Sequence, residues 1–229
     1  IITASTSGAG KGGNIQLTSK NISISGQNPT SGGTDIPTGI EAVTRSSSSA
    51  APGGNIQITT HSLQMDHQGS ISTASSGLGT GGNIEVSADN VKLANNASIR
   101  ASSESTGQAG TISIQAKTDV KLSDNSEVST SAPNSSGGNI TVKAGQIVKL
   151  EDSQITAQAG LNGGNIEVSA NNRVYLLHSK FTAQADQTGT GFGNGGNITI
   201  DPSFFILTDS SLISKSSLGN GGNITIQSG

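Results

Sequence analysis

Apolar residues recur at every second position in short segments of the chain, and these segments come in groups of three. One group has its apolar pairs at Ile84 and Val86, then at 91–93, and then at 99–101. Alternation with a period of two buries one face of a strand and leaves the other in water. Asn, Asp, Ser and Gly, which are turn residues, separate the segments. The pattern predicts three short strands in each group.

The groups are internal repeats, because each begins with nearly the same tetrapeptide. Gly-Gly-Asn-Ile starts at Gly12, Gly53, Gly81, Gly137, Gly163, Gly195 and Gly221, and a degenerate copy starts at Ala109. Successive copies are 41, 28, 28, 28, 26, 32 and 26 residues apart. Helical repeats would need a period of 3.6 and good helix formers, and a calcium-binding β-roll would need a nine-residue repeat. Both alternatives disagree with the sequence.

Three strands per repeat predict an all-β fold, a right-handed single-stranded parallel β-helix. It is a three-faced solenoid of about eight coils that forms one array over residues 1–229. Coils would stack at the usual interstrand spacing of about 4.8 Å. Equivalent residues then form columns, and one column contains only isoleucine: Ile15, Ile56, Ile84, Ile112, Ile140, Ile166, Ile198 and Ile224. Each buried Ile or Val contributes about 1.5–3 kcal/mol before chain entropy is subtracted.

The Gly-Gly-Asn corner is expected to turn the chain through positive φ angles, which Gly adopts freely and Asn tolerates. Its asparagines should stack in a hydrogen-bonded ladder along the rod. Thr111 replaces one of them, so we expect the ladder to be interrupted and that coil to be looser.

Composition narrows the possible functions. The chain has 32 Gly, no Cys, no Trp and 12% charged residues, with a net charge of −3. Without clusters of Lys and Arg, nucleic acid and anionic membranes are not expected partners. No run of 18 apolar residues predicts a membrane span. Only 2% of residues are aromatic, which disfavours the sugar cleft of a polysaccharide-cleaving enzyme.

Two columns and two insertions are the candidate sites. A polar column follows the second strand and could hold a divalent cation or a catalytic group, but corner geometry explains it better: His67, Asn95, Asp124, Asp152, His178 and Asp209. Lys92, Lys121 and Lys149 form an outward column, interpreted as a solvated face with Asp89, Asp119 and Glu151 nearby. Insertion loops are expected near 27–38, between strands two and three, and near 186–194; they could bind a ligand or be neutral. His61 is expected to be exposed without a partner. We expect no catalytic, cofactor-binding or metal-binding residues.

Coils such as Gly193–Ile213, which reads GNGGNITIDPSFFILTDSSLI, resemble the filamentous haemagglutinin-type repeats of bacterial two-partner secretion exoproteins. The resemblance covers essentially the whole chain. It implies a secreted, adhesin-like protein at the cell surface, exported through an outer-membrane secretion pore, with a glycan or cell-surface receptor as a possible target. It also implies an internal segment of a longer shaft, and no functional residue of the family can be carried over.

The leading hypothesis is therefore a non-catalytic structural or adhesive shaft. The alternative is a polysaccharide-binding or polysaccharide-cleaving β-helix.

Overall fold

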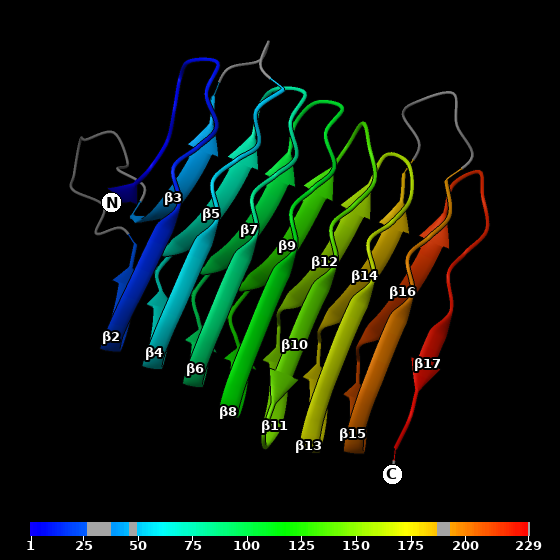
Figure 1. Cartoon of the computed structure of the whole chain (residues 1–229). Helices are drawn as coiled ribbons and strands as arrows, with labels where there is room; N and C mark the ends of the chain where they lie inside the picture. Colours follow the sequence, from blue (N-terminus) through cyan, green and yellow to red (C-terminus); the bar gives the residue numbers. More distant parts are fainter. Residues whose placement is uncertain (27–37, 46–49, 187–192, 229) are drawn as a thin grey trace, which may run out of the picture.

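The computed structural model describes residues 1–26, 38–45, 50–186 and 193–228, and its regular structure in these residues is entirely β-strand. The strands form two parallel sheets that run side by side along one rod (Figure 1). The first sheet consists of short strands: β1 (Ile2–Thr3), β3 (Gly39–Thr44), β5 (Ser70–Ser75), β7 (Ser98–Ser103), β9 (Glu127–Ala132), β12 (Gln154–Ala159), β14 (Lys180–Ala185) and β16 (Ser211–Ser216). The second consists mainly of long strands: β2 (Ile15–Ser25), β4 (Ile56–Asp66), β6 (Ile84–Leu93), β8 (Ile112–Leu122), β10 (Ile140–Ala144), β11 (Ile147–Glu151), β13 (Ile166–Leu177), β15 (Ile198–Thr208) and β17 (Ile224–Ile226).

Each coil contains one long strand followed by one short strand, whereas the sequence predicted three separate strands. The first two predicted strands are the two halves of one long strand that bends in the middle. In β6 the register shifts at this bend, between Ala88 and Asn90, and pairing with β8 continues on both sides. In one coil the halves separate into β10 and β11. Hydrogen bonding thus passes through the bend, because one irregular residue absorbs the change of direction.

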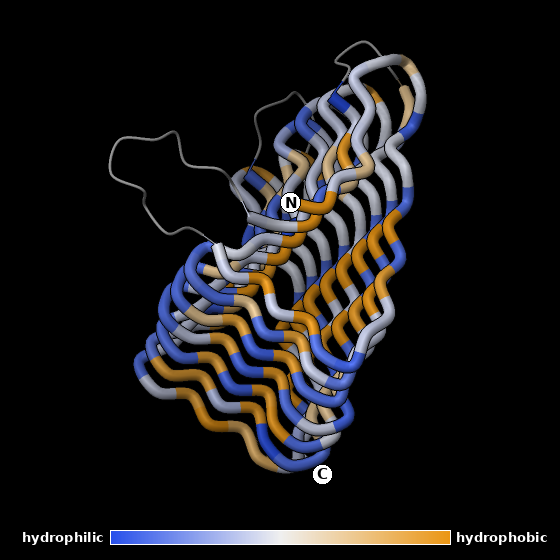
Figure 2. The backbone as a smooth tube through the Cα atoms, turned by 90° about the vertical axis from the view of Figure 1, so that its left-hand side faces the viewer, coloured by the Kyte–Doolittle hydropathy of each residue, from blue (hydrophilic) through white to orange (hydrophobic). Residues whose placement is uncertain are grey.

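The coils stack in register as a β-solenoid of about six turns, with incomplete coils at the ends. The predicted isoleucine column is confirmed, since each member pairs with the next, as Ile140 does with Ile112 and Ile166. Its members from Ile15 to Ile198 are buried, whereas Ile224 is 44% exposed. Figure 2 shows the apolar positions of successive coils lining up in bands along the rod. The core is therefore a set of columns.

The glycines of the Gly-Gly-Asn corner are required by close packing, and the predicted positive φ angles are absent there. Neither these glycines nor the asparagines that follow them have a positive φ in the described part of the chain. A Cβ on Gly138 would overlap the carbonyl oxygen of Gly110 one coil away, and a Cβ on Gly110 would overlap that of Gly82. The backbones approach too closely for a side chain. The second glycine is accordingly present in all eight copies, whereas the first is replaced once, by Ala109.

The asparagine ladder exists, but its rungs join side chain to backbone. The Asn165 side-chain oxygen accepts a 2.8 Å hydrogen bond from the backbone N–H of Asn197, and the Asn197 oxygen accepts one from Asn223. At the substituted position, the Thr111 N–H and hydroxyl both donate to Asn83. Among the described residues, no such bond joins Thr111 to Asn139 on the next coil. The predicted interruption is confirmed, while the looseness of that coil stays a prediction.

Candidate functional site

The polar column after the second half of each long strand is a left-handed corner, as its residue types predicted. All six members have positive φ angles between 45° and 56°: His67, Asn95, Asp124, Asp152, His178 and Asp209. Asn, Asp and His adopt this conformation more readily than most non-glycine residues. The backbone also links the coils here, because the carbonyl oxygen of Asp152 accepts from Asn125 at 2.7 Å. The column has a structural role at every coil.

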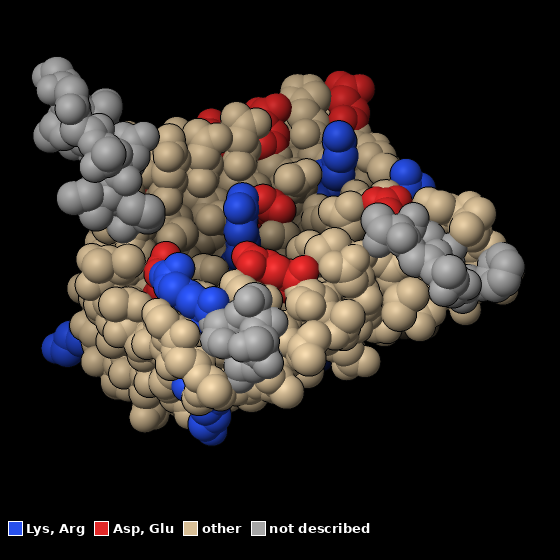
Figure 3. All heavy atoms as spheres, turned by 90° about the horizontal axis from the view of Figure 1, so that it is seen from above, with Lys and Arg blue, Asp and Glu red and all other residues tan. Residues whose placement is uncertain are grey.

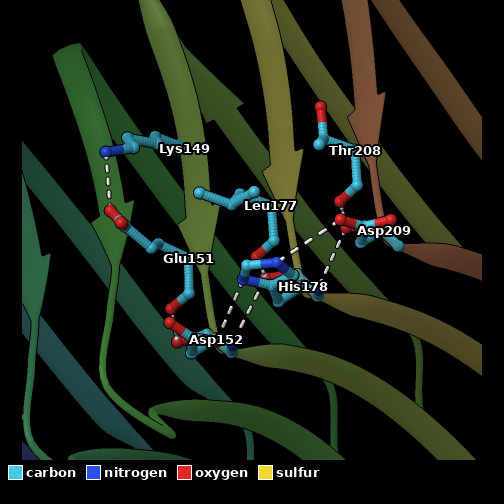
Figure 4. Close-up of polar contacts among 10 residues, drawn as sticks. Lys149, Glu151, Asp152, Leu177, His178, Thr208 and Asp209 are labelled. Carbon is cyan, nitrogen blue, oxygen red and sulfur yellow. Dashed lines mark hydrogen bonds and ion pairs between the residues drawn. The ribbon is translucent and has the colours of Figure 1, made fainter.

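His178 lies between two carboxylates of this left-handed corner (Figure 4). Its Nδ1 lies 3.4 Å from Asp152 on the preceding coil, and its Nε2 lies 3.5 Å from Asp209 on the following one. All three side chains are at least half exposed. In the described residues, no three His, Asp or Glu side chains come together in a way that could hold a metal ion. An exposed histidine between two carboxylates strengthens its contacts when it is protonated, and it can do so without binding a ligand.

The lysine column is in register as predicted, but its ion pairs differ from the expected set. Lys121 lies 2.7 Å from Asp119, and Lys149 lies 2.7 Å from Glu151. Lys149 also lies over the ring of Tyr175 on the next coil, 5.9 Å from its centroid. Lys92 has no side-chain partner among the described residues, since Asp89 points elsewhere. These pairs are exposed and resemble an ordinary solvated face.

Asp89 instead joins His61 and Lys117 at the bend of three successive coils, so the prediction that His61 has no partner is wrong. His61 Nδ1 lies 2.7 Å from one Asp89 oxygen, and Lys117 Nζ lies 2.7 Å from the other. The hydrogen bond from Lys117, followed by the one from His61, holds the pKa of the Asp89 carboxyl below its ordinary value of 3.8. Asp89 is thus kept as a carboxylate by its neighbours.

The insertion loops predicted near 27–38 and 186–194 lie mostly outside the described residues. At the edge of the second, the Asp186 carboxylate accepts hydrogen bonds from the side chains of Gln158, at 2.8 Å, and of Gln184.

A feature that the sequence reasoning missed is a groove on the outer face of the short-strand sheet. It encloses about 500 Å³ and crosses five coils, from β3 to β12. Figure 3 looks onto this hollow, with acidic and basic side chains on its floor. The floor is low because many outward residues of the short strands are small, including Ser72, Ala74, Ser102 and Ser131. Aligning outward positions of the third predicted strand across repeats would have found this row of small residues.

Two ion pairs stand within this groove. Arg45 contacts Glu41 at 3.0 Å, and Arg100 contacts Glu127 across two coils at 2.8 Å. Each guanidinium is more than half exposed, whereas each carboxylate is only 20% exposed. Glu104 also lines the groove, and its carboxylate has no ion-pair partner in the described part of the chain. The groove therefore offers hydrogen-bond donors and acceptors together.

Comparison of the chain with models of protein families, with curated proteins and with solved structures finds no match. What the structure itself defines is the class: a β-solenoid repeat protein of stacked parallel coils. Among the described residues, no helix is long and apolar enough to cross a membrane.

Proposed function

We propose that this chain is a non-catalytic structural shaft of a secreted bacterial surface protein, which holds regions for cell or surface attachment away from the cell. In this proposal an outer-membrane pore exports it, as the resemblance to filamentous haemagglutinin-type repeats implies. The observation that carries the proposal is the uninterrupted stacking of coils. Every strand from β2 to β15 pairs with the equivalent strand of the neighbouring coil, and the buried columns pass from coil to coil.

A shaft benefits from this organisation because each coil contacts little besides its neighbours. The stability of such an array is close to a sum of coil and interface contributions, so its length can change without redesign of the whole. An enzyme instead needs one coil or groove that departs from the repeat. The left-handed corner follows the repeat at every coil, which favours a structural role.

The acid groups with shifted pKa values also support a non-catalytic protein. The hydrogen bond from Asn95 lowers the pKa of the Asp66 carboxyl, and Lys117 and His61 lower that of Asp89. A carboxyl group that acts as a general acid near neutral pH needs the opposite shift, a raised pKa. Asp66 and Asp89 are therefore poorly suited to polysaccharide cleavage.

Deletion of one coil tests the shaft proposal. Removal of residues 84–111 joins Asn83 to Ile112, so that β4 and β5 are followed directly by β8 and β9. We expect a folded protein that unfolds cooperatively and whose rod is shorter by about 4.8 Å, as measured by circular dichroism and small-angle scattering. The control deletion of residues 84–97 removes a long strand and leaves its short partner, and it should unfold several coils. Equal damage by both deletions would contradict the proposal.

Surface labelling tests the location. Antibodies against this chain should label intact cells of the source bacterium, and labelling should disappear after surface proteolysis or loss of the exporting pore. A cytoplasmic protein serves as the control for cell integrity. Labelling that requires permeabilised cells would contradict the proposed export.

A further inference from the structure

The groove over the short strands goes beyond the shaft proposal and does not depend on it. It follows the rod axis across the outward faces of β3, β5, β7, β9 and β12, so equivalent floor residues repeat at the interstrand spacing of about 4.8 Å. A ligand that uses this groove along its length is an extended polymer that presents similar groups at each step.

The backbone of the floor is not available to such a polymer. Each short strand from β3 to β14 is paired on both sides with its neighbours, so its N–H and C=O groups lie within the sheet. An extended polypeptide binds most readily by adding a strand at a free sheet edge, where it finds backbone partners. This floor presents only side chains, which disfavours a peptide.

Charge and polarity narrow the ligand further. Three carboxylates and two guanidinium groups line the groove, which leaves one net negative charge: Glu41, Glu104, Glu127, Arg45 and Arg100. An anionic polymer would be repelled or at best gain nothing. Most other lining side chains are Ser, Thr or Gln, and none of the large exposed apolar residues of the described chain lies there. An apolar ligand would therefore lose its water without compensation.

We propose that this groove is a binding site for a neutral, hydroxyl-rich polysaccharide that lies along the rod. Sugar hydroxyl groups both donate and accept hydrogen bonds, so they match a floor of hydroxyls, amides, exposed guanidinium groups and a free carboxylate. The lining contains no aromatic ring for a sugar to stack on. Each coil then contributes weakly, and affinity rises with the number of sugar residues that the groove holds.

Affinity gel electrophoresis tests this site. The chain is run through gels that contain xylan, glucomannan, galactomannan or mixed-linkage glucan, with polygalacturonate as the anionic comparison. We expect retardation by at least one neutral polysaccharide, competition by its long oligosaccharides, and little competition by its disaccharide. Absence of retardation in every neutral gel, or retardation by polygalacturonate alone, would overturn the proposal.

Two groove variants locate the binding. Ser102→Tyr fills the middle of the floor and should weaken binding about tenfold or more, which corresponds to about 1.4 kcal/mol. Thr141→Tyr makes the same change on the outer face of the long-strand sheet and should leave binding unchanged. Arg100→Ala removes an exposed donor and serves as a second groove variant if Ser102→Tyr does not fold by circular dichroism. Equal weakening by Thr141→Tyr, or unchanged binding in both groove variants, would refute the assignment.

Discussion

The two corners of each coil, the glycine corner and the left-handed corner, change the direction of the chain by different physical means. At the glycine corner, Gly138 lies so close to the carbonyl of Gly110 that no side chain fits. At the left-handed corner, Asp124 keeps its side chain in water and adopts a φ of 56°. The second glycine never varies among the eight repeats, whereas the left-handed corner accepts His, Asn or Asp. A limit on space tolerates one residue type, while a limit on conformation tolerates several.

The strongest test of this difference is Gly138→Ala. The added methyl group would overlap the Gly110 carbonyl, so the two coils must separate, and we expect a loss of about 3 kcal/mol or more in the free energy of unfolding. Urea unfolding followed by circular dichroism measures it. Gly10→Ala is the control, since a Cβ there meets nothing within 4 Å. A cost below that of an ordinary surface change would show that the coils are not packed this closely.

The left-handed corner should respond to conformation alone. Asp124→Val places a β-branched residue at positive φ and should cost about 1–2 kcal/mol. Asp124→Gly adopts the same φ without strain and should change the free energy of unfolding by less than about 0.5 kcal/mol, because its extra chain entropy offsets part of the gain. Thermal unfolding distinguishes the two. If glycine were as harmful as valine, the Asp124 side chain would have a role that its contacts do not show.

The ladder beside the glycine corner should have a smaller and reversible effect. Asn165→Ala removes the acceptor of the Asn197 N–H and should cost about 1 kcal/mol. Conversely, Thr111→Asn provides the missing acceptor for Asn139 and should stabilise the chain by about 0.5–1 kcal/mol. Hydrogen exchange of the Asn139 and Asn197 amides reports each change directly. Slower exchange at Asn139 is expected in the Thr111→Asn variant, and no change there would contradict the interpretation of Thr111 as a break.

The smallest predicted effect is electrostatic and lies at the left-handed corner. The Asn95 side chain donates a 2.6 Å hydrogen bond to Asp66 and is the main cause of its lowered pKa. With this pKa below 3.8, Asp66 favours the folded state at higher pH, and that contribution is lost as the pH falls through the lowered value. Asn95→Gly should keep the backbone and move the pKa of Asp66 back towards 3.8. Carboxyl NMR titration measures it, and Asn96→Gly, which makes no such bond, should leave Asp66 unchanged.

The fold could be predicted from the sequence because its main signals are local and repeated. The isoleucine column and the left-handed corner follow from alternation, from turn residues and from the spacing of the Gly-Gly-Asn-Ile copies. The role of the glycines could not be predicted, because two explanations, positive φ and close approach, favour the same residue. Only the position of the next coil distinguishes them.

The candidate sites were harder to predict, because they depend on which residues meet between coils. His61, Asp89 and Lys117 are 28 residues apart in sequence, and the register shift next to Asp89 changes which side chains share a bend. The groove depends on small residues such as Ser102 and on the height of the walls beside them. Neither property appears in the strand pattern of one repeat.

The direction of the hydrogen bonds between coils has a mechanical consequence. They run along the rod, so a force that pulls its two ends apart loads the coils in series and opens them by peeling, one row of bonds at a time. A coil of 28 residues releases about 90 Å of extended chain when it opens, at about 3.3 Å per residue. Under tension the rod would lengthen in steps and dissipate work at each step, and the coils that remained closed would keep their structure.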